Sequence, residues 1–423
     1  MLRRRADRLK SSFSTLRENE MLLTLSGMQI IIMFGFGMIS PILPLYARTF
    51  DVSTAMVGLL ITSFGVARLF TNLPAGKLAD RIGRRPLILT GPLITGVGAL
   101  LAGFAPGFWL LVGARFVQGL GSAMSATASM TVLADVSTPE TRGKTMSVFQ
   151  GSLLLGAAIG PAIGGALAGL VGLRGVFFIY AASAFGVAIW ARLRVKETLR
   201  PGASEEVPAS KPGRIAFGSG TTMAMLMNVS FLAISLVSIA IFFTRTGARS
   251  TIIPLIGAEK LGLSAVGIGN VLTVAAVLNV LVLPVAGWSI DRFGRKRTIV
   301  PSTMVSAAGI FLFALSPNLT TFVAAAVVLG IGTGIAGPAP AAYVADLAKG
   351  RNYGSTMGLF RTISDAGFVI GPILLGWVAD QRGFSFSLYL NAALLLIAGL
   401  AFAMLAKEER VTRSPAGNPE REA

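Results

Sequence analysis

Apolar residues along this chain do not alternate with polar ones but continue for about 20 residues at a time, between residues 22 and 406. A helix that crosses a bilayer needs a run of this length. A membrane barrel would instead show strands of about ten residues with apolar and polar positions in alternation. The pattern therefore predicts an all-α polytopic membrane protein.

Glycine, proline and charged residues divide the apolar sequence into twelve predicted spans, six in each half of the chain. The basic head, MLRRRADRLK, precedes a first run that is too long for the core of a signal peptide. The predicted spans are 22–47, 53–75, 86–105, 107–134, 145–169, 174–193, 223–258, 264–286, 298–316, 320–345, 355–379 and 385–406.

One long segment between the sixth and seventh runs, residues 194–222, is rich in Pro, Ser, Gly and mixed charge. We therefore predict two six-helix bundles joined by a connector. The predicted division is a basic tail at 1–21, a first bundle at 22–193, the connector at 194–222, a second bundle at 223–406 and a tail at 407–423.

Most of the 37 lysines and arginines fall in the two tails and in alternate loops, whereas the opposite loops carry only Arg48, Arg174, Lys260 and Arg382. The positive-inside rule places the richer side, with both termini, in the cytoplasm. We expect a multi-pass protein of the cell (inner) membrane. The net charge of +18 is spread over segments that face lipid headgroups, so we expect a lipid bilayer and no nucleic acid as its partner.

The chain contains neither cysteine nor histidine. Thiolate and imidazole chemistry are therefore excluded, and we expect no metal site, no cofactor and no enzymatic activity. Proton transfer inside the membrane would have to use carboxylates.

The stretches GKLADRIGRR (76–85) and GWSIDRFGRK (287–296) repeat one pattern at a spacing of 211 residues. The same spacing relates Gly58 to Gly269 and Gly160-Pro161 to Gly371-Pro372. An internal repeat of this length predicts two pseudo-symmetric halves about an axis along the membrane normal. The residues shared by the loops are Gly76, Asp80, Arg81, Gly83, Arg84 and Arg85, and Gly287, Asp291, Arg292, Gly294 and Arg295.

Together with the twelve spans, GKLADRIGRR resembles the major facilitator superfamily. RFVQGLGSA (115–123) and GAAIGPAIGG (156–165) are similar to its twelve-span drug:proton antiporter group. The resemblance implies the major facilitator fold and alternating access. It also implies that Asp80 and Asp291 latch onto the helix starts of spans eleven and five when the cytoplasmic side closes.

Small residues in span five, Gly156, Gly160 and Gly164, share one helical face, and Pro161 bends the helix. The resemblance implies that this motif, which includes Gly165, seals the two halves against ion leakage. General helix packing is the alternative explanation.

Charged residues inside the spans are costly and so mark candidate sites. We predict a substrate and proton pathway that contains Arg115, Arg245, Arg249, Arg361 and Asp365. The resemblance associates Arg115 with proton transfer. Asp365 is the only acid near the middle of a span, and its alternative role is a structural pair with Arg361. Arg68, nearer a span end, is expected to extend to the headgroups.

The motifs predict a secondary transporter that exports small amphipathic compounds in exchange for protons, as a monomer. Because the spans are rich in arginine and poor in acids, an alternative cargo is an organic anion, a phosphorylated metabolite or a lysolipid.

Overall fold

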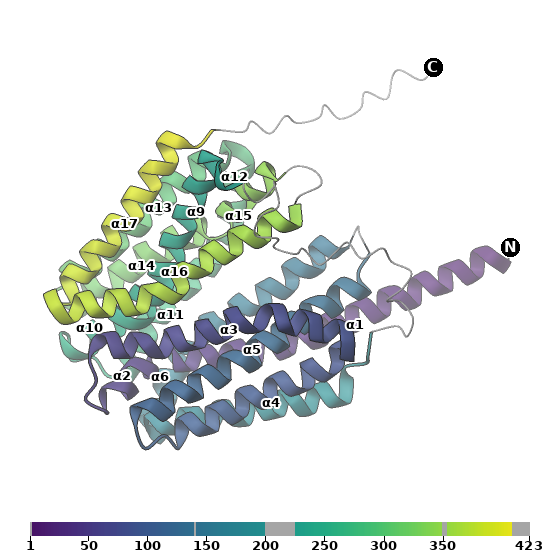
Figure 1. Cartoon of the computed structure of the whole chain (residues 1–423), viewed down its shortest axis with the longest axis horizontal. Helices are drawn as coiled ribbons and strands as arrows, with labels where there is room; N and C mark the ends of the chain where they lie inside the picture. The colour runs from purple at the N-terminus through teal and green to yellow at the C-terminus, as the bar shows by residue number, and fades with distance from the viewer. Residues whose placement is uncertain (1, 139–140, 199–224, 349–352, 408–423) are drawn as a thin grey trace.

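The computed structural model describes residues 2–138, 141–198, 225–348 and 353–407, and every regular element within these ranges is a helix. The helices form two groups that lie together near α2 and α10 and diverge toward the end where α1 begins (Figure 1). Most of the predicted connector falls outside the described residues. So do Met1 and most of the C-terminal tail.

The first half contains six elements. They are α1 (Leu2–Ile39), α2 (Ile42–Arg48), α3 (Thr54–Ile82), α4 (Arg84–Gly103), α5 (Phe108–Val136) and α6 (Arg142–Arg194). Gly172 divides α6 into two helices because its φ of 75° lies in the region that glycine tolerates. Predicted spans five and six lie on either side of this residue.

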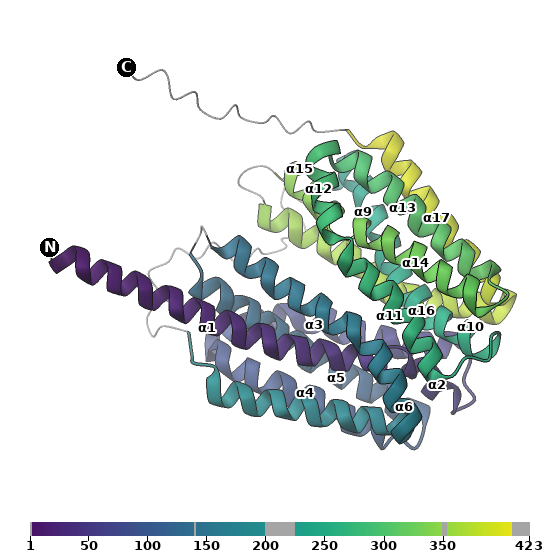
Figure 2. The same ribbon diagram turned by 180° about the vertical axis from the view of Figure 1, so that it is seen from behind.

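The second half follows the same plan with more interruptions. Its elements are α9 (Val229–Phe243), η1 (Thr244–Ile252), α10 (Ile253–Glu259), α11 (Ala265–Leu281), α12 (Leu283–Phe293), α13 (Arg295–Leu315), α14 (Leu319–Ala336), α15 (Ala339–Leu347), α16 (Tyr353–Arg382) and α17 (Phe384–Leu405). The order can be followed from behind in Figure 2.

Nine helices of the described ranges are long and apolar enough to cross a membrane, or ten if α11 and α12, bent by 41°, count as one. The long α6 contains two spans. Although α5 is not among the nine, because Ser, Gly, Arg115 and Gln118 lower its hydropathy, it lies within the first bundle. The predicted all-α fold with two six-helix bundles is confirmed.

The span boundaries need four corrections. Span one begins within a helix that starts at Leu2 and breaks at Ser40 and Pro41 rather than continuing to residue 47. Span seven consists of α9, η1 and α10, span eight of α11 and α12, and span ten of α14 and α15. Proline at or beside three of these breaks, at positions 41, 284 and 338, explains why the helices do not continue.

The predicted loops at 76–85 and 287–296 are helical except at one glycine each. α3 continues to Ile82, and α4 begins at Arg84. Gly83 (φ 99°) and Gly294 (φ 90°) make the turns, and a side chain would be strained at both positions. Gly76 and Gly287 lie inside helices instead.

Two seams join the halves: α3 packs against α16, and α6 packs against α11. We call the end of the molecule with Gly83 and Gly294 the basic side, and the end with α2 and α10 the far side. In both seams the close contacts lie toward the far side.

The seams use equivalent residues. A Cβ at Gly58 would overlap the carbonyl oxygen of Pro372, and a Cβ at Gly269 would overlap that of Pro161. Thr62 donates to the carbonyl of Val369 (2.6 Å), and its repeat equivalent Thr273 accepts from the amide of Ala162 (2.8 Å). Pro372 and Pro161 interrupt the backbone hydrogen bonds of their own helices. In each seam a threonine of the opposite half bonds a backbone group near the proline.

A polar network closes the far side. Asp380 accepts from the backbone amides of Thr54 and Ala55 (2.8 Å each) at the start of α3. Arg48 pairs with Glu259 (2.8 Å) and also donates to Val52 and Thr54. A carboxylate at a helix N-terminus stabilises the contact because it meets unpaired N–H groups and the positive end of the dipole.

Candidate translocation site

Toward the basic side, α3 and α16 are still in close contact at Phe368. Gly65 of α3 lies so close to the ring of Phe368 that a Cβ would overlap it, and Thr246 of η1 donates to the carbonyl of Phe368 (3.1 Å). This carbonyl lies four residues before Pro372, which has no N–H to offer it. The three helices therefore meet at one point, which we call the Phe368 junction.

Charged residues lie just beyond the junction, toward the basic side. Arg68 is three residues after Gly65 on α3, Asp365 is three residues before Phe368 on α16, and Arg245 directly precedes Thr246. Arg361 is one further turn along α16. We call Arg68, Arg245, Arg361 and Asp365 the charged cluster.

Asp365 is the only acid of the cluster. It is partly buried and makes no ion pair within 4.0 Å to any described residue. The charges that act on it most strongly are those of Arg361 and Arg68. The ion pair with Arg361, which is the alternative role of Asp365, is therefore absent in this state.

The prediction that Arg68 extends to the headgroups is wrong. Its guanidinium lies 5.8 Å from the centre of the Phe64 ring and donates to Ser122 of α5 (3.4 Å). The charges that act on it most strongly, Arg361 and Asp365, belong to the second half. Its repeat equivalent is Asn279, so the spacing of 211 gave no signal for it.

Arg245 and Arg249 lie in η1, a π-helix that the sequence analysis did not predict. Ser250 and Thr251 donate to the carbonyls five residues earlier, of Arg245 (3.1 Å) and Thr246 (3.0 Å). The run of Thr, Ser, Gly and Arg inside an apolar span was the available signal, since hydroxyls compete for backbone carbonyls. π-Turns occur frequently at functional sites.

The two arginines of η1 have different surroundings. Arg245 is exposed, as is Arg361. Arg249 donates to the carbonyl of Leu272 in α11 (3.4 Å). Arg249 is therefore turned toward a helix of its own half.

Arg115 lies inside the first half, beside the same Phe64 ring as Arg68, and is only 2% exposed. Its guanidinium lies 4.6 Å from the ring centre of Phe64 and 5.9 Å from that of Phe36, and it donates to Gln118 (2.5 Å). No carboxylate of the described residues pairs with it, and its Nε has no hydrogen-bond partner. The aromatic faces take the place of a counter-ion.

The polar turns on the basic side are paired within their own halves. Arg84 contacts Asp80 (3.2 Å) and Asp135 (3.1 Å), and its repeat equivalent Arg295 contacts Asp291 (3.6 Å) and Asp346 (3.0 Å). The side chains of Asp80 and Asp291 are 56% and 83% exposed. No hydrogen bond or ion pair of the described ranges links these turns to the opposite half.

The protein-family model for the Major Facilitator Superfamily matches residues 25–247 and 235–422, which together cover most of the chain. The chain belongs to the major facilitator superfamily. Membership makes the protein a transporter rather than an enzyme and identifies the repeat as its two bundles.

Similar members are known in other organisms. Multidrug resistance protein 2 of Bacillus subtilis is 26% identical over 377 residues, which cover 89% of this chain and 92% of that protein. A solved bacterial homologue of the human lysosomal transporter Spinster, in an inward-facing and occupied conformation, has a TM-score of 0.77 at 18% identity and covers 91% of this chain and 96% of its own. The human organic anion transporter MFSD10 has a TM-score of 0.64 at 16% identity, with 91% and 99% covered.

The residues of the span-five motif, 156–165, pack against two different helices. Gly156, Gly160 and Gly164 pack against α1 of the same half, so the expectation that they seal the halves is wrong for these three in the state described. Pro161 and Gly165 contact α11 of the other half, as does Ala162 between them. General helix packing accounts for the first three residues.

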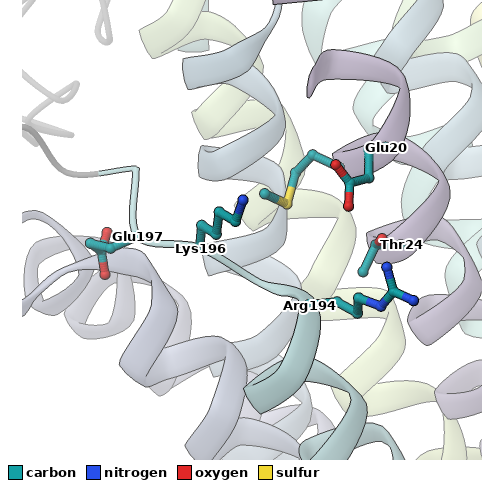
Figure 3. Close-up of a pocket in the computed structure, with 6 residues that line it drawn as sticks. Glu20, Thr24, Arg194, Lys196 and Glu197 are labelled. Atoms are coloured by element: carbon teal, nitrogen blue, oxygen red, sulfur yellow. The ribbon is translucent and has the colours of Figure 1, made fainter. Parts of the chain in front are cut away.

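A separate cavity of about 320 Å³ lies on the basic side within the first half (Figure 3). Glu20, Thr24, Arg194, Lys196 and Glu197 line it, and Glu197 also accepts from the backbone amides at the start of α4 (3.0 Å). Because all its walls belong to one half, this cavity does not lie on a route between the bundles. No group of three or more potential metal ligands occurs in the described ranges.

Proposed function

We propose that this chain is a secondary active transporter that exports small amphipathic compounds in exchange for protons. The observation that carries the proposal is the position of Asp365, the one acid beside the Phe368 junction. The multidrug resistance relative supports the class of cargo. We expect a monomer in the cell (inner) membrane, with the basic side in the cytoplasm.

Alternating access is supported by the distribution of contacts between the halves. The hydrogen bonds that cross from one half to the other in the described ranges involve Arg48, Thr54, Ala55, Thr62 and Ala162 of the first half, all toward the far side. The state described is therefore closed on the far side. Rocking of the two halves about the Phe368 junction would open the far side and close the basic side.

The latch is part of this proposal. Asp80 and Asp291 are exposed and bonded within their own halves, as expected when the basic side is open. On closure we propose that each acid reaches a helix start of the opposite half, in the way that Asp380 meets α3 on the far side.

A proton carrier must gain and lose a proton inside the membrane. Arginine stays protonated, and the chain has no histidine, which leaves Asp365 as the carrier. Burial favours its neutral form, whereas the cations of the cluster favour its carboxylate. The balance between them can change with the conformation.

The test replaces Asp365 with Asn in proteoliposomes, with substrates first found in a counterflow panel of cationic dyes, organic anions and lysolipids. We expect Asp365→Asn to retain passive exchange and to lose accumulation driven by a pH gradient. Asp51→Asn, which alters an exposed acid on the far side, is the matched control and should still accumulate substrate. Accumulation by Asp365→Asn under a proton gradient alone would refute the role of Asp365.

A second candidate cargo is an organic anion, a phosphorylated metabolite or a lysolipid. The observation that favours it is the excess of arginine in the charged cluster, three cations against one acid. The likeness in fold to the organic anion transporter agrees with it. Arg245→Gln or Arg249→Gln should weaken binding of an anion by at least about 1.5 kcal/mol, and should leave a cation unaffected or better bound. Equal affinity of the double variant and the wild type for an anion that the panel identifies would exclude this candidate.

A further inference from the structure

The two cations that act most strongly on Asp365 belong to different halves of the molecule. Arg361 stands four residues away on the same helix and moves with Asp365 when the halves rock. Arg68 stands on α3, across the seam. If each half moves as a rigid body, only the distance between Arg68 and Asp365 can differ between the two states.

Other helices that pack against α16 add no further cross-half charge. Of these, α9 and α17 contain no Asp, Glu, Lys or Arg, and η1 contributes Arg245 and Arg249, which belong to the same half as Asp365. The acid of α15, Asp346, is bonded to Arg295. On the first half, α3 also carries Lys77, Asp80 and Arg81, about two to four turns nearer the basic side, and Arg115 of α5 lies against Phe64. Of these cross-half charges, Arg68 is the one that acts on Asp365 in the state described.

The direction of the change follows from where the two residues lie. Gly65 and Phe368 are in contact, and Arg68 and Asp365 come three residues later and earlier, on the segments that diverge toward the basic side (Figure 1). In the state described they are not within 4.0 Å. Closing the basic side brings these segments together.

We propose that Arg68 is the conformation-dependent counter-ion of Asp365, and that their ion pair forms when the basic side closes. Protonation of Asp365 removes the pair and favours the state open to the basic side. The inference rests on the proposed role of Asp365 as the proton carrier.

Linkage between protonation and conformation determines in which direction pH shifts the equilibrium between the two states. A nearby cation lowers the proton affinity of a carboxylate, so Asp365 binds a proton less tightly in the state closed on the basic side. Alkaline pH then favours that closed state, and acid favours the open one. Arg361 lowers the proton affinity equally in both states, so it sets the pH of the transition but not its extent.

The absence of cysteine allows two spin labels to be introduced without removing native residues. Lys144→Cys on α6 and Val285→Cys on α12 place labels on exposed positions of opposite halves. Electron–electron distance measurements in nanodiscs across a pH series then give the ratio of open to closed molecules on the basic side.

We expect acidification to raise this ratio by about tenfold or more in the labelled parent protein. Arg68→Gln should abolish the response, Arg68→Lys should retain most of it, and Arg361→Gln should displace the transition along the pH axis without reducing its extent. Arg68→Met, a second neutral variant, covers the case in which Arg68→Gln fails to fold.

A full response in both neutral variants of Arg68 would overturn the inference while leaving Asp365 as carrier. A full response in Asp365→Asn would overturn both the inference and the proposed proton site. A parent protein whose label distances do not change with pH would overturn the inference.

Discussion

The seam between α3 and α16 and the seam between α6 and α11 are built alike but differ in charge. Each has a glycine against a proline carbonyl and a threonine bonded to the opposite backbone. Only the first has an acid beside it and a cation on the opposite half; beside the second, Arg249 bonds Leu272 of its own half. The repeat equivalents of Arg68, Arg361 and Asp365 are Asn279, Gln150 and Leu154, and that of Asp380 is Gly169.

In the seam between α6 and α11, the residues equivalent to Arg68 and Asp380 make their contacts without any charge. Asn279 donates to Thr333 of its own half (3.0 Å), and Gly169 lies against the side chain of Val266. Both seams use the same small residues for close packing, whereas only one of them has an acid beside it. Both seams lie close enough to act as pivots, and one of them also has the charged cluster beside it.

The largest expected effect comes from filling the glycine contacts, and it should be equal in the two seams. Gly58→Ala and Gly269→Ala each place a Cβ against a backbone carbonyl. Overpacking of this kind should destabilise the state closed on the far side by about 1–3 kcal/mol. Label distances between Asp51→Cys and Lys260→Cys, exposed on the far side, measure the loss. Gly113→Ala, which meets open space, is the control, and a much larger effect in one seam would contradict their equivalence.

Removing the threonine hydroxyls should distinguish the seams by a smaller amount. Thr273→Val leaves the amide of Ala162 without its partner, which should destabilise the far-side contact by about 1–2 kcal/mol. Thr62→Val leaves a carbonyl short of one donor, a condition that proteins tolerate more often, and we expect about half the effect. The same label pair measures both. A larger loss in Thr62→Val than in Thr273→Val would contradict the expectation that an unpaired amide costs more than an unpaired carbonyl.

The smallest effect is expected at the pair that lies between the seams. Arg48 and Glu259 are 30% and 41% exposed, so Glu259→Gln should weaken far-side closure by less than about 1 kcal/mol, and less still at high salt. Arg48→Gln should be somewhat worse because Arg48 also bonds Val52 and Thr54. The exchange Arg48→Glu with Glu259→Arg should recover part of the loss in the same distance measurement, and no recovery would show that the pair itself contributes nothing.

The sequence predicted the architecture well because membrane helices depend on local properties. Apolar length and the spacing of 211 are visible without any tertiary contact, and they were sufficient for two six-helix bundles. The breaks at Ser40–Pro41 and within span seven were missed. The first lies inside an apolar run, where hydrophobicity gives no boundary. The second coincides with the polar run of η1, which was taken as part of one long span.

The candidate site was only partly predictable. Asp365, Arg245 and Arg361 were identified because charge inside a span is rare. Arg68 was assigned to the headgroups because its distance from the span end was known but the helix across the seam was not. The roles of Gly156 and Gly165 differ although they belong to one motif, since a helix presents different faces to different neighbours and sequence spacing does not say which neighbour is there.

The pair of Arg48 with Glu259 joins two positions that are 211 residues apart and therefore equivalent in the repeat. If the halves were separate, identical subunits of a twofold dimer, such a contact would set each residue against its own copy. Arginine would meet arginine and the interface would repel itself. A single fused chain is free of that requirement, and here the two copies of one position have become opposite in sign. This contact thus requires two different halves: two copies of either half, assembled as a pair, would lose it.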